Sequence, residues 1–275
     1  MSDIIERLLK ILTIIVIAVW SLFPIAFVVV SSIKPPGDIF AYPPKWLFTP
    51  TLQNYVDLWL EFGEFFHTLG NSIIVSIGAT VFTTAVGFMA GYVYSRYSGR
   101  LIAASALYMI AIRLLPPIVV TLPLFPIVSW LRLSDTHIVL ILLYSAFWVS
   151  LVTVILKTFI DEIPRELDEA AEIDGASQWQ ILMRVILPLT AQGLAAGAIF
   201  VFIFAWNEFL FALIFTTSQA KTAPLVLSEV MDAIYGTSWG VLFAGVTIQL
   251  LPVLLLVVLA NRLIVAGLTA GSVKG

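Results

Sequence analysis

The sequence predicts an all-α membrane protein, with six transmembrane helices and one amphipathic helical hairpin outside the membrane. Of its 275 residues, 60% are hydrophobic and 11% are charged, whereas a soluble domain carries roughly 25% charge. Six stretches are apolar for about 20 residues, the length needed to cross the hydrocarbon core of a bilayer. The charged residues gather between these stretches and in one long segment, residues 161–188.

The six expected spans follow one another along a single transmembrane domain, residues 1–275. They cover residues 11–31, 71–95, 103–127, 136–156, 189–216 and 239–261. Proline interrupts the third span at Pro116, Pro117, Pro123 and Pro126, so that span is expected to be irregular. Residues 34–70 are rich in proline and aromatic side chains. Two interpretations of that segment stay open: an interfacial helix on the membrane, or a contact surface for an external partner.

The distribution of basic residues predicts the orientation. Six spans place both termini on one side, and assigning that side to the cytoplasm puts nine basic residues inside and four outside. The nine are Arg7, Lys10, Arg96, Arg100, Lys157, Arg165, Arg184, Arg262 and Lys274, and the four are Lys34, Lys45, Arg132 and Lys221. This bias agrees with the positive-inside rule and places residues 161–188 in the cytoplasm.

Residues 161–188 form the expected hairpin. They hold seven of the seventeen carboxylates: Asp161, Glu162, Glu166, Asp168, Glu169, Glu172 and Asp174. Gly175 is a natural C-terminal stop for a first helix. Ser177 and Gln180 have the spacing of a capping box for a second helix, which would carry Trp179, Leu182 and Ile186 on one apolar face. Such a face, with nothing in its own loop to cover it, predicts docking into a groove of a partner.

The hairpin resembles the EAA loop of ABC importer permeases. The resemblance rests on Glu169-Ala170-Ala171, on Gly175 after three intervening residues, and on Val185-Ile186-Leu187-Pro188, where Val185 departs from the family's isoleucine. In that family the loop sits in a cleft of the ATP-hydrolysing subunit. The resemblance therefore implies a coupling role for Glu169, Ala170, Ala171, Asp174, Gly175, Leu187 and Pro188. The alternative is a solvated acidic linker between two membrane helices.

Several classes of site are excluded by what the sequence lacks. There is no cysteine, and His67 and His137 are seventy residues apart, so no metal-binding spacing is present. There is no P-loop, so the chain is not expected to be an enzyme or to bind ATP itself. The net charge of −3 gives no reason to expect nucleic acid.

Two ionisable residues lie deep in expected spans, Arg113 and Glu208. A charge near the bilayer centre costs at least about 2.5–3.5 kcal/mol, so each is expected to face the bundle interior or a wet cavity. They either line a translocation path or form a structural pair. The segment Trp206-Asn207-Glu208-Phe209 is similar to one found in carbohydrate permeases. The candidate path residues are Asn71, Arg113, Trp206, Asn207 and Glu208, although Asn71 is equally suited to cap its own helix.

The loop that follows the fifth span, residues 217–238, is long for a connection between helices. Val226, Val230 and Ile234 are four residues apart and predict a short helix with an apolar face. In the family, the corresponding loop reaches into the binding protein. The flexible polar approach 217–222 would be the inserted part, with Ser218, Gln219, Lys221 and Thr222 as candidate contacts. The alternative is a lid that closes the outer mouth of the bundle.

The whole chain, including its tail 262–275, resembles the shorter, second permease of maltose- and trehalose-type ABC importers. The resemblance implies a type I ABC importer permease fold and a carbohydrate cargo, a disaccharide such as trehalose or maltose. It implies a multi-pass protein of the cytoplasmic membrane. Its partners would be a second permease, two ATP-binding subunits that hold ATP and Mg²⁺, an extracytoplasmic sugar-binding protein and membrane lipid. Two alternatives remain: a permease for an amino acid, peptide or polyol, and a membrane protein that does not transport.

Overall fold

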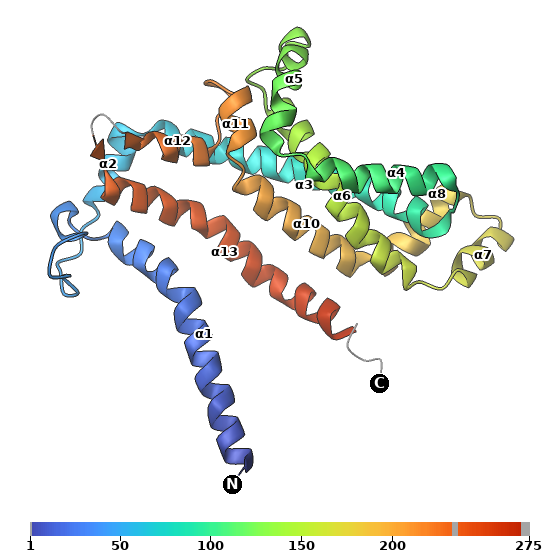
Figure 1. The fold of residues 1–275 in the computed structure, drawn as a ribbon, viewed down its shortest axis with the longest axis horizontal. Coiled ribbons are helices and arrows are strands. Elements are labelled where there is room, and N and C mark those ends of the chain that lie inside the picture. Colours follow the sequence, from blue (N-terminus) through green and yellow to red (C-terminus); the bar gives the residue numbers. More distant parts are fainter. Residues whose placement is uncertain (1, 233–235, 271–275) are drawn as a thin grey trace. The chain divides into compact units, whose positions relative to one another are not determined.

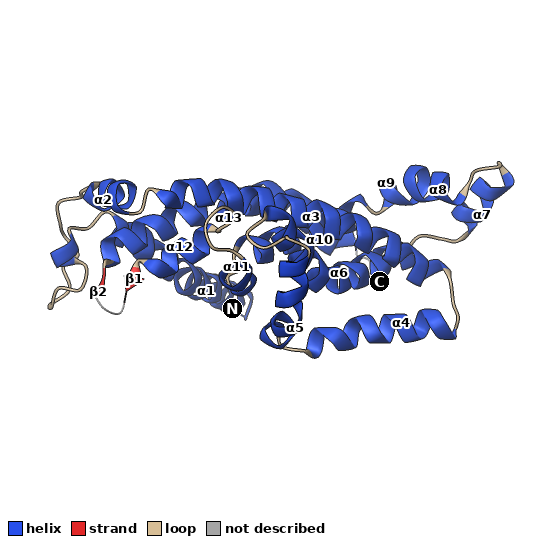
Figure 2. Cartoon of the chain, turned by 90° about the horizontal axis from the view of Figure 1, so that it is seen from above, coloured by secondary structure: helices blue, strands red, loops and turns tan. Residues whose placement is uncertain are grey.

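The computed structural model describes residues 2–232 and 236–270, and over these residues the chain is helical apart from two short strands. Strands β1 (Met231–Asp232) and β2 (Gly236–Thr237) pair antiparallel, with Met231 opposite Thr237. Figure 2 shows how small this pair is beside the helices. The predicted all-α class is confirmed.

Four helices are long and apolar enough to cross a membrane. They are α1 (Ser2–Ser32), α3 (Glu64–Arg96), α6 (His137–Asp161) and α13 (Trp239–Ala270), all labelled in Figure 1. Two further stretches pass the same test as bent pairs: α4 (Arg100–Ala111) with α5 (Pro117–Trp130), bent by 100°, and Gln178–Leu189 with α10 (Ala191–Trp206), bent by 80°. The described part of the chain therefore holds four to six candidate spans, and the six boundaries expected from the sequence stay a prediction.

Proline and polar caps explain the breaks inside the expected spans. Leu115 is extended, with φ −73° and ψ 128°, because the residue before a proline is driven out of the α region. A single 3-10 turn, Ile112–Leu114, precedes it. The expected fifth span is divided between α10, which ends at Trp206, and α11 (Leu210–Phe215).

The sequence predicts a single domain, and the structure groups its helices into two compact units. The first unit, Met1–His67 with Val226–Leu251, contains α1, the turn η1 (Pro36–Asp38), α2 (Gln53–Glu61) and both strands. Within it the buried side chain of Asn54 donates to the carbonyls of Ser32 and Lys34, each at 2.8 Å. These bonds tie α2 to the chain that leaves α1.

The second unit, Thr68–Leu225 with Pro252–Gly275, is built on α3, α6 and α10. Buried apolar side chains from these helices and from neighbouring segments form two clusters. One contains Val75, Val139, Tyr144, Ala205 and Phe211, and the other contains Phe88, Val152, Ile160, Ile186 and Val201. Gly91 lets α3 approach α6 closely, since a Cβ there would lie 3.1 Å from the backbone nitrogen of Lys157. Helix α12 (Ala223–Glu229) is shared between the two units.

Candidate functional site

The polar hairpin lies beyond the end of α6, where both views of the chain show α7 and α8 (Figures 1 and 2). Its first helix is α7 (Glu166–Ile173), and its second arm runs through α8 (Gln178–Gln180), a π-helix (Ile181–Ile186) and α9 (Leu187–Leu189). The predicted capping box is confirmed, because Ser177 and Gln180 exchange both of its hydrogen bonds.

Gly175 shapes the turn between the two arms. Its φ is +81°, in the left-handed region that glycine enters without steric cost. The N–H of Gly175 donates to the carbonyl of Glu172, and the N–H of Ala176 donates to that of Ala171, both at 2.9 Å. This pair of bonds is a Schellman motif, which satisfies the last carbonyls of α7. The Ala171 and Gly175 of the EAA-like pattern are thus two parts of one helix stop.

A π-helix changes which residues of the second arm are buried. Pro188 has no N–H to donate to the carbonyl of Arg184, and its ring crowds that carbonyl, so a regular α-turn is disfavoured there. Leu182 and Ile186 are buried in an apolar cluster formed by the chain itself, where Ile181 joins them, so the predicted docking of this face into a partner is wrong for these two residues. Trp179, from the same predicted face, is 60% exposed.

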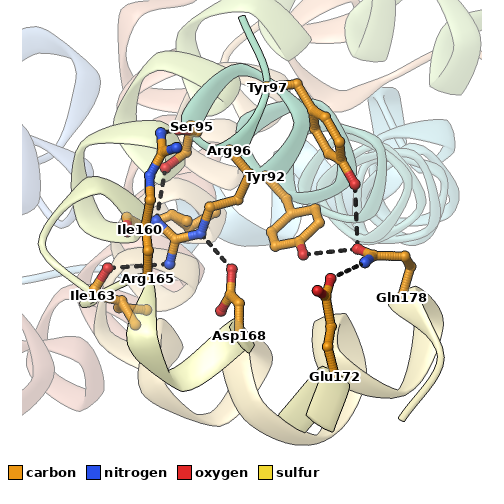
Figure 3. A network of polar contacts seen from close by, with 10 residues as sticks. All are labelled: Tyr92, Ser95, Arg96, Tyr97, Ile160, Ile163, Arg165, Asp168, Glu172 and Gln178. Atoms are coloured by element: carbon orange, nitrogen blue, oxygen red, sulfur yellow. Dashed lines mark hydrogen bonds and ion pairs between the residues drawn. The ribbon is translucent and has the colours of Figure 1, made fainter. Parts of the chain in front are cut away.

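An ion pair joins the hairpin to the C-terminal end of α3 (Figure 3). Arg96 Nε lies 2.6 Å from the Asp168 carboxylate, and both side chains are almost fully buried. The other guanidinium nitrogens of Arg96 donate to the carbonyls of Ile160 and Ile163, at 3.3 and 3.1 Å. In return, Arg165 Nη2 donates to the carbonyl of Ser95 at 2.8 Å. The first arm is therefore fixed to α3 and to the end of α6.

The second arm is fixed to the same end of α3. The hydroxyls of Tyr92 and Tyr97 both donate to Gln178 Oε1, at 3.2 Å, as Figure 3 shows. The amide nitrogen of Gln178 donates in turn to the carboxylate of Glu172, on α7. Both arms thus belong to one polar network that joins them to α3.

The opposite face of α7 is left exposed. Glu169, Ala170, Ile173 and Asp174 are exposed, and Ile173 is 87% exposed. Positions i, i+1, i+4 and i+5 share one side of a helix, so these four make a continuous surface, which we call the α7 docking face. Of the other predicted coupling residues, Gly175 and Pro188 are exposed, whereas Ala171 and Leu187 are half-buried against the apolar cluster of Ile186. The sequence analysis missed Ile173, although its position four residues after Glu169 places both residues on one side of the helix.

The two ionisable residues predicted to lie deep in spans do not meet. Among the described residues, neither Arg113 nor Glu208 takes part in an ion pair. The Arg113 guanidinium lies over the Trp148 ring at 5.2 Å and near the Phe147 ring at 6.0 Å, a cation–π arrangement. The Glu208 carboxylate accepts from the backbone N–H of Phe211 at 2.8 Å and of Ala212 at 3.3 Å, so it caps α11. The structural pair considered for these residues is therefore absent, because each has another partner.

Trp206 and Asn207 also have local roles. Trp206 is 1% exposed and stacks on Phe202 with ring centroids 5.8 Å apart, so its ring faces no open path in this conformation. The exposed Asn207 donates to the carbonyl of Ile203 at 2.7 Å and ends α10.

Asn71 holds the loop 217–222 instead of capping its own helix. Its Nδ2 donates to the carbonyls of Gln219 and Lys221, each at 2.9 Å, and its Oδ1 lies 2.7 Å from His137 Nε2. Because both amide hydrogens are used, Oδ1 must accept, and His137 Nε2 carries the proton. Nearby, Ser72 Oγ accepts from the N–H of Ala223 at 2.9 Å. The polar groups of Asn71 are thus occupied, and the residue is 3% exposed.

The prediction of a flexible polar approach at 217–222 is wrong. The carboxylate of Asp135, in the turn between α5 and α6, accepts hydrogen bonds from the backbone N–H groups of residues 217–220. Burial raises the pKa of Asp135, but these four bonds outweigh it and hold that pKa well below its usual value. Of the predicted contacts, Ser218 and Gln219 are exposed, Lys221 is half-buried and Thr222 is 3% exposed. The apolar helix expected nearby is α12, which ends at Glu229. Val226 therefore lies in this helix and Val230 lies just beyond its end; both are buried, and Ile234 lies outside the described residues.

Comparisons with known proteins agree with this architecture. A family profile described as "Binding-protein-dependent transport system inner membrane component" matches residues 83–269. The chain is 35% identical over 288 residues to the trehalose/maltose transport system permease protein MalG of Thermococcus litoralis, covering 100% of this chain and 99% of that protein. It is 35% identical over 263 residues to the trehalose transport system permease protein SugB of Mycobacterium tuberculosis, covering 93% of each. Its fold is similar to that in the crystal structure of a bacterial ABC transporter that imports alginate, with a TM-score of 0.78, 17% identity, and 95% and 97% of the two chains covered.

Proposed function

The chain belongs to the family of inner membrane components of binding-protein-dependent transport systems, and on this premise we propose that it is the second permease of an ATP-driven importer of carbohydrate. As a permease subunit of an ABC transporter it is multi-pass, is not catalytic, and has no cofactor of its own, since ATP is bound by partner subunits. The fold class expected from the sequence, an ABC importer permease fold, is confirmed.

The single observation that supports carbohydrate is similarity over the full length of the chain. MalG and SugB are permeases of trehalose or maltose systems, and each matches over more than nine-tenths of its length. We propose a disaccharide such as trehalose or maltose as the cargo. A relative at 32% identity over 263 residues, from Agrobacterium fabrum, belongs to a sulfoquinovosyl glycerol system. This observation favours a second candidate, a sugar-bearing glycerol.

The proposed coupling mechanism uses the hairpin. The α7 docking face is exposed while the rest of the hairpin is fixed to α3 through Arg96, Asp168 and Gln178. A partner that grips this face would move α3 with it, because the buried ion pair leaves the hairpin little freedom. We propose that two ATP-binding subunits serve the complex, and that one of them binds this face. A second permease would complete the translocation path, with Arg113, Trp206, Asn207 and Glu208 as candidate lining residues in a conformation where they are uncovered.

We further propose that both termini and the hairpin lie in the cytoplasm. An extracytoplasmic sugar-binding protein would then dock on the opposite side, where Ser218, Gln219 and Lys221 are candidate contacts. Thr222 is removed from that set because its side chain is buried.

Uptake by the purified complex tests the cargo. The chain is purified from membranes with its co-purifying subunits, reconstituted into liposomes with the binding protein, and offered labelled trehalose, maltose, a glycerol glycoside and an amino acid in turn. We expect ATP-dependent uptake of a disaccharide. Uptake of the amino acid alone would contradict the carbohydrate assignment, and the absence of any co-purifying ATP-binding subunit would contradict the importer.

A further inference from the structure

Six hydrogen-bond donors converge on one carboxylate at the outer loop. The backbone N–H groups of residues 217–220 reach Asp135 at distances between 3.0 and 3.2 Å. The hydroxyls of Thr217 and Ser218 add two bonds of 3.0 Å each. The backbone N–H of Asp135 in turn donates to the carbonyl of Phe215 at 2.9 Å. Four consecutive N–H groups thus find their acceptor in a single side chain from a distant turn.

The position of Asp135 explains why the residue is an aspartate. Its φ is +56°, a left-handed value that Asp and Asn tolerate better than other residues with side chains. Successive N–H groups that point to one spot form a nest for an anion. Because the chain's own carboxylate fills this nest, the loop takes its shape without a ligand.

A second tether fixes the far end of the same loop. Asn71 binds the carbonyls of Gln219 and Lys221, and Ser72 binds the N–H of Ala223. Asp135 and Asn71 come from the α5–α6 turn and from α3, and all of these residues lie in one compact unit. In the segment 217–223, which these contacts hold, only the side chains of Thr217, Ser218 and Gln219 are exposed. We call these three residues the loop tip.

The loop tip and the hairpin lie at opposite ends of α3. Asn71 and Arg96 are both on this helix, and the 25 residue steps from one to the other correspond to about 38 Å at the α-helical rise. That distance exceeds the hydrocarbon thickness of a bilayer, roughly 30 Å. If the hairpin meets the ATP-binding subunit, the tip emerges on the other face of the membrane, where a binding protein docks. The Thr217 and Ser218 hydroxyls already donate to Asp135, so only their oxygens can accept from a partner. The side-chain amide of Gln219 is an uncharged group suited to hydrogen-bonding a protein surface.

We propose that Asp135 is a positioning residue that holds the loop tip as a pre-formed contact for the substrate-binding protein. The inference rests on the proposed function, and it deepens that function by naming the residue that fixes the contact. A flexible loop loses conformational freedom when a partner binds it, whereas a loop already held in one shape does not. Asp135 therefore acts on the affinity of docking and not on the turnover of the docked complex.

The test uses Asp135→Asn, which keeps the left-handed residue and the size of the side chain but removes the charge and one acceptor oxygen. Arg132→Asn is the matched control, since Arg132 lies in the same turn with φ +55° and is exposed. The chain has no cysteine, so Gln219→Cys places a single nitroxide label on the tip of each variant. In parallel, the complete transporter in nanodiscs, with Gln219 unchanged, is titrated with purified, sugar-loaded binding protein while its ATPase rate is measured.

We expect Asp135→Asn to make the label at position 219 more mobile before any binding protein is added. The binding-protein concentration for half-maximal ATPase stimulation should rise on the order of tenfold, with a similar maximal rate; tenfold corresponds to about 1.4 kcal/mol. Arg132→Asn should change neither quantity. A merely structural role for Asp135 would lower the maximal rate without this shift in the half-maximal concentration.

Each remaining outcome decides the matter. If the label at position 219 stays immobile in Asp135→Asn, the proposal that Asp135 holds the loop tip is wrong. A mobile label with an unchanged half-maximal concentration would show that the tip does not contact the binding protein. If Asp135→Asn fails to assemble, the double variant Thr217→Val with Ser218→Ala is used in its place, because it removes two of the six donors to Asp135. An unchanged label mobility in this double variant would also overturn the proposal. Failure of the proposed carbohydrate cargo would leave the mobility result intact.

Discussion

Individual residues in left-handed conformations shape both polar ends of this permease. Gly175, in the turn that ends α7, has φ +81°. Asp135, whose carboxylate binds the loop tip, has φ +56°. A Cβ at Gly175 would meet no heavy atom within 4 Å. The constraint there is therefore the backbone conformation alone, without a steric clash against a neighbour.

The Gly175 turn gives the first prediction. Gly175→Val should disturb the turn, because a β-branched residue at positive φ is strongly disfavoured, and sugar uptake and stimulated ATPase should fall several-fold while the protein still inserts. Gly175→Asn is the control at the same position, since Asn tolerates the left-handed region, and it should keep most of the activity. Equal activity of the two variants would show that the turn does not matter for coupling.

The second prediction concerns Arg113 and Glu208. Because they have separate partners, Arg113→Gln and Glu208→Gln should lower thermal stability independently. Their effects should add within about 0.5 kcal/mol. A double variant markedly milder than the sum of the two single variants, measured by thermal unfolding in detergent, would indicate a direct pair in solution.

The pH dependence of the loop tip follows from Asp135. Its pKa is lowered in the folded protein, so its contribution to stability is present above the usual aspartate pKa of about 3.9 and is lost as pH falls below that value. The nitroxide at position 219 should therefore keep the same mobility from about pH 8 to pH 5. Loosening inside that interval would mean that another group controls the loop.

At the scale of the elements, the hairpin depends on one buried ion pair. Removing one partner of a buried pair leaves an uncompensated charge and costs about 3–5 kcal/mol. An exposed pair separated by four residues in a helix contributes about 0.3–0.5 kcal/mol. The chain contains one pair of each kind close to the hairpin: Arg96 with Asp168, and Lys157 with Asp161.

These two pairs give a matched comparison. Asp168→Asn should destabilise the protein and loosen the hairpin, which lowers its affinity for the ATP-binding subunit. Lys157→Ala should change the free energy of unfolding by no more than about 0.5 kcal/mol. Thermal unfolding and co-purification of the ATP-binding subunit would measure both effects. Similar results for the two variants would remove the ion pair from the coupling mechanism.

At the scale of the whole molecule, the proposed topology places the hairpin and the loop tip, near the two ends of α3, on opposite sides of the membrane. Single cysteines at Ile173, on the α7 docking face, and at Gln219, on the loop tip, are both exposed. An impermeant thiol reagent applied to intact cells should label position 219 and not position 173, and inside-out vesicles should give the reverse. Labelling of both positions from one side would refute the proposed topology.

The sequence by itself determined the all-α membrane class, the hairpin and its capping box, and the left-handed turn at Gly175. These features depend on composition, on periodicity and on local backbone chemistry within a few residues. The tertiary structure decided which polar residues meet. Asn71 and Asp135 hold a loop about 150 and 80 residues away, Arg96 pairs with Asp168, and Arg113 and Glu208 find separate partners. Such contacts arise where helices distant in sequence pack together, so no local sequence pattern predicts them. For the same reason the loop 217–222, whose polar composition predicts flexibility, is hydrogen-bonded to Asp135 and Asn71, both distant in sequence.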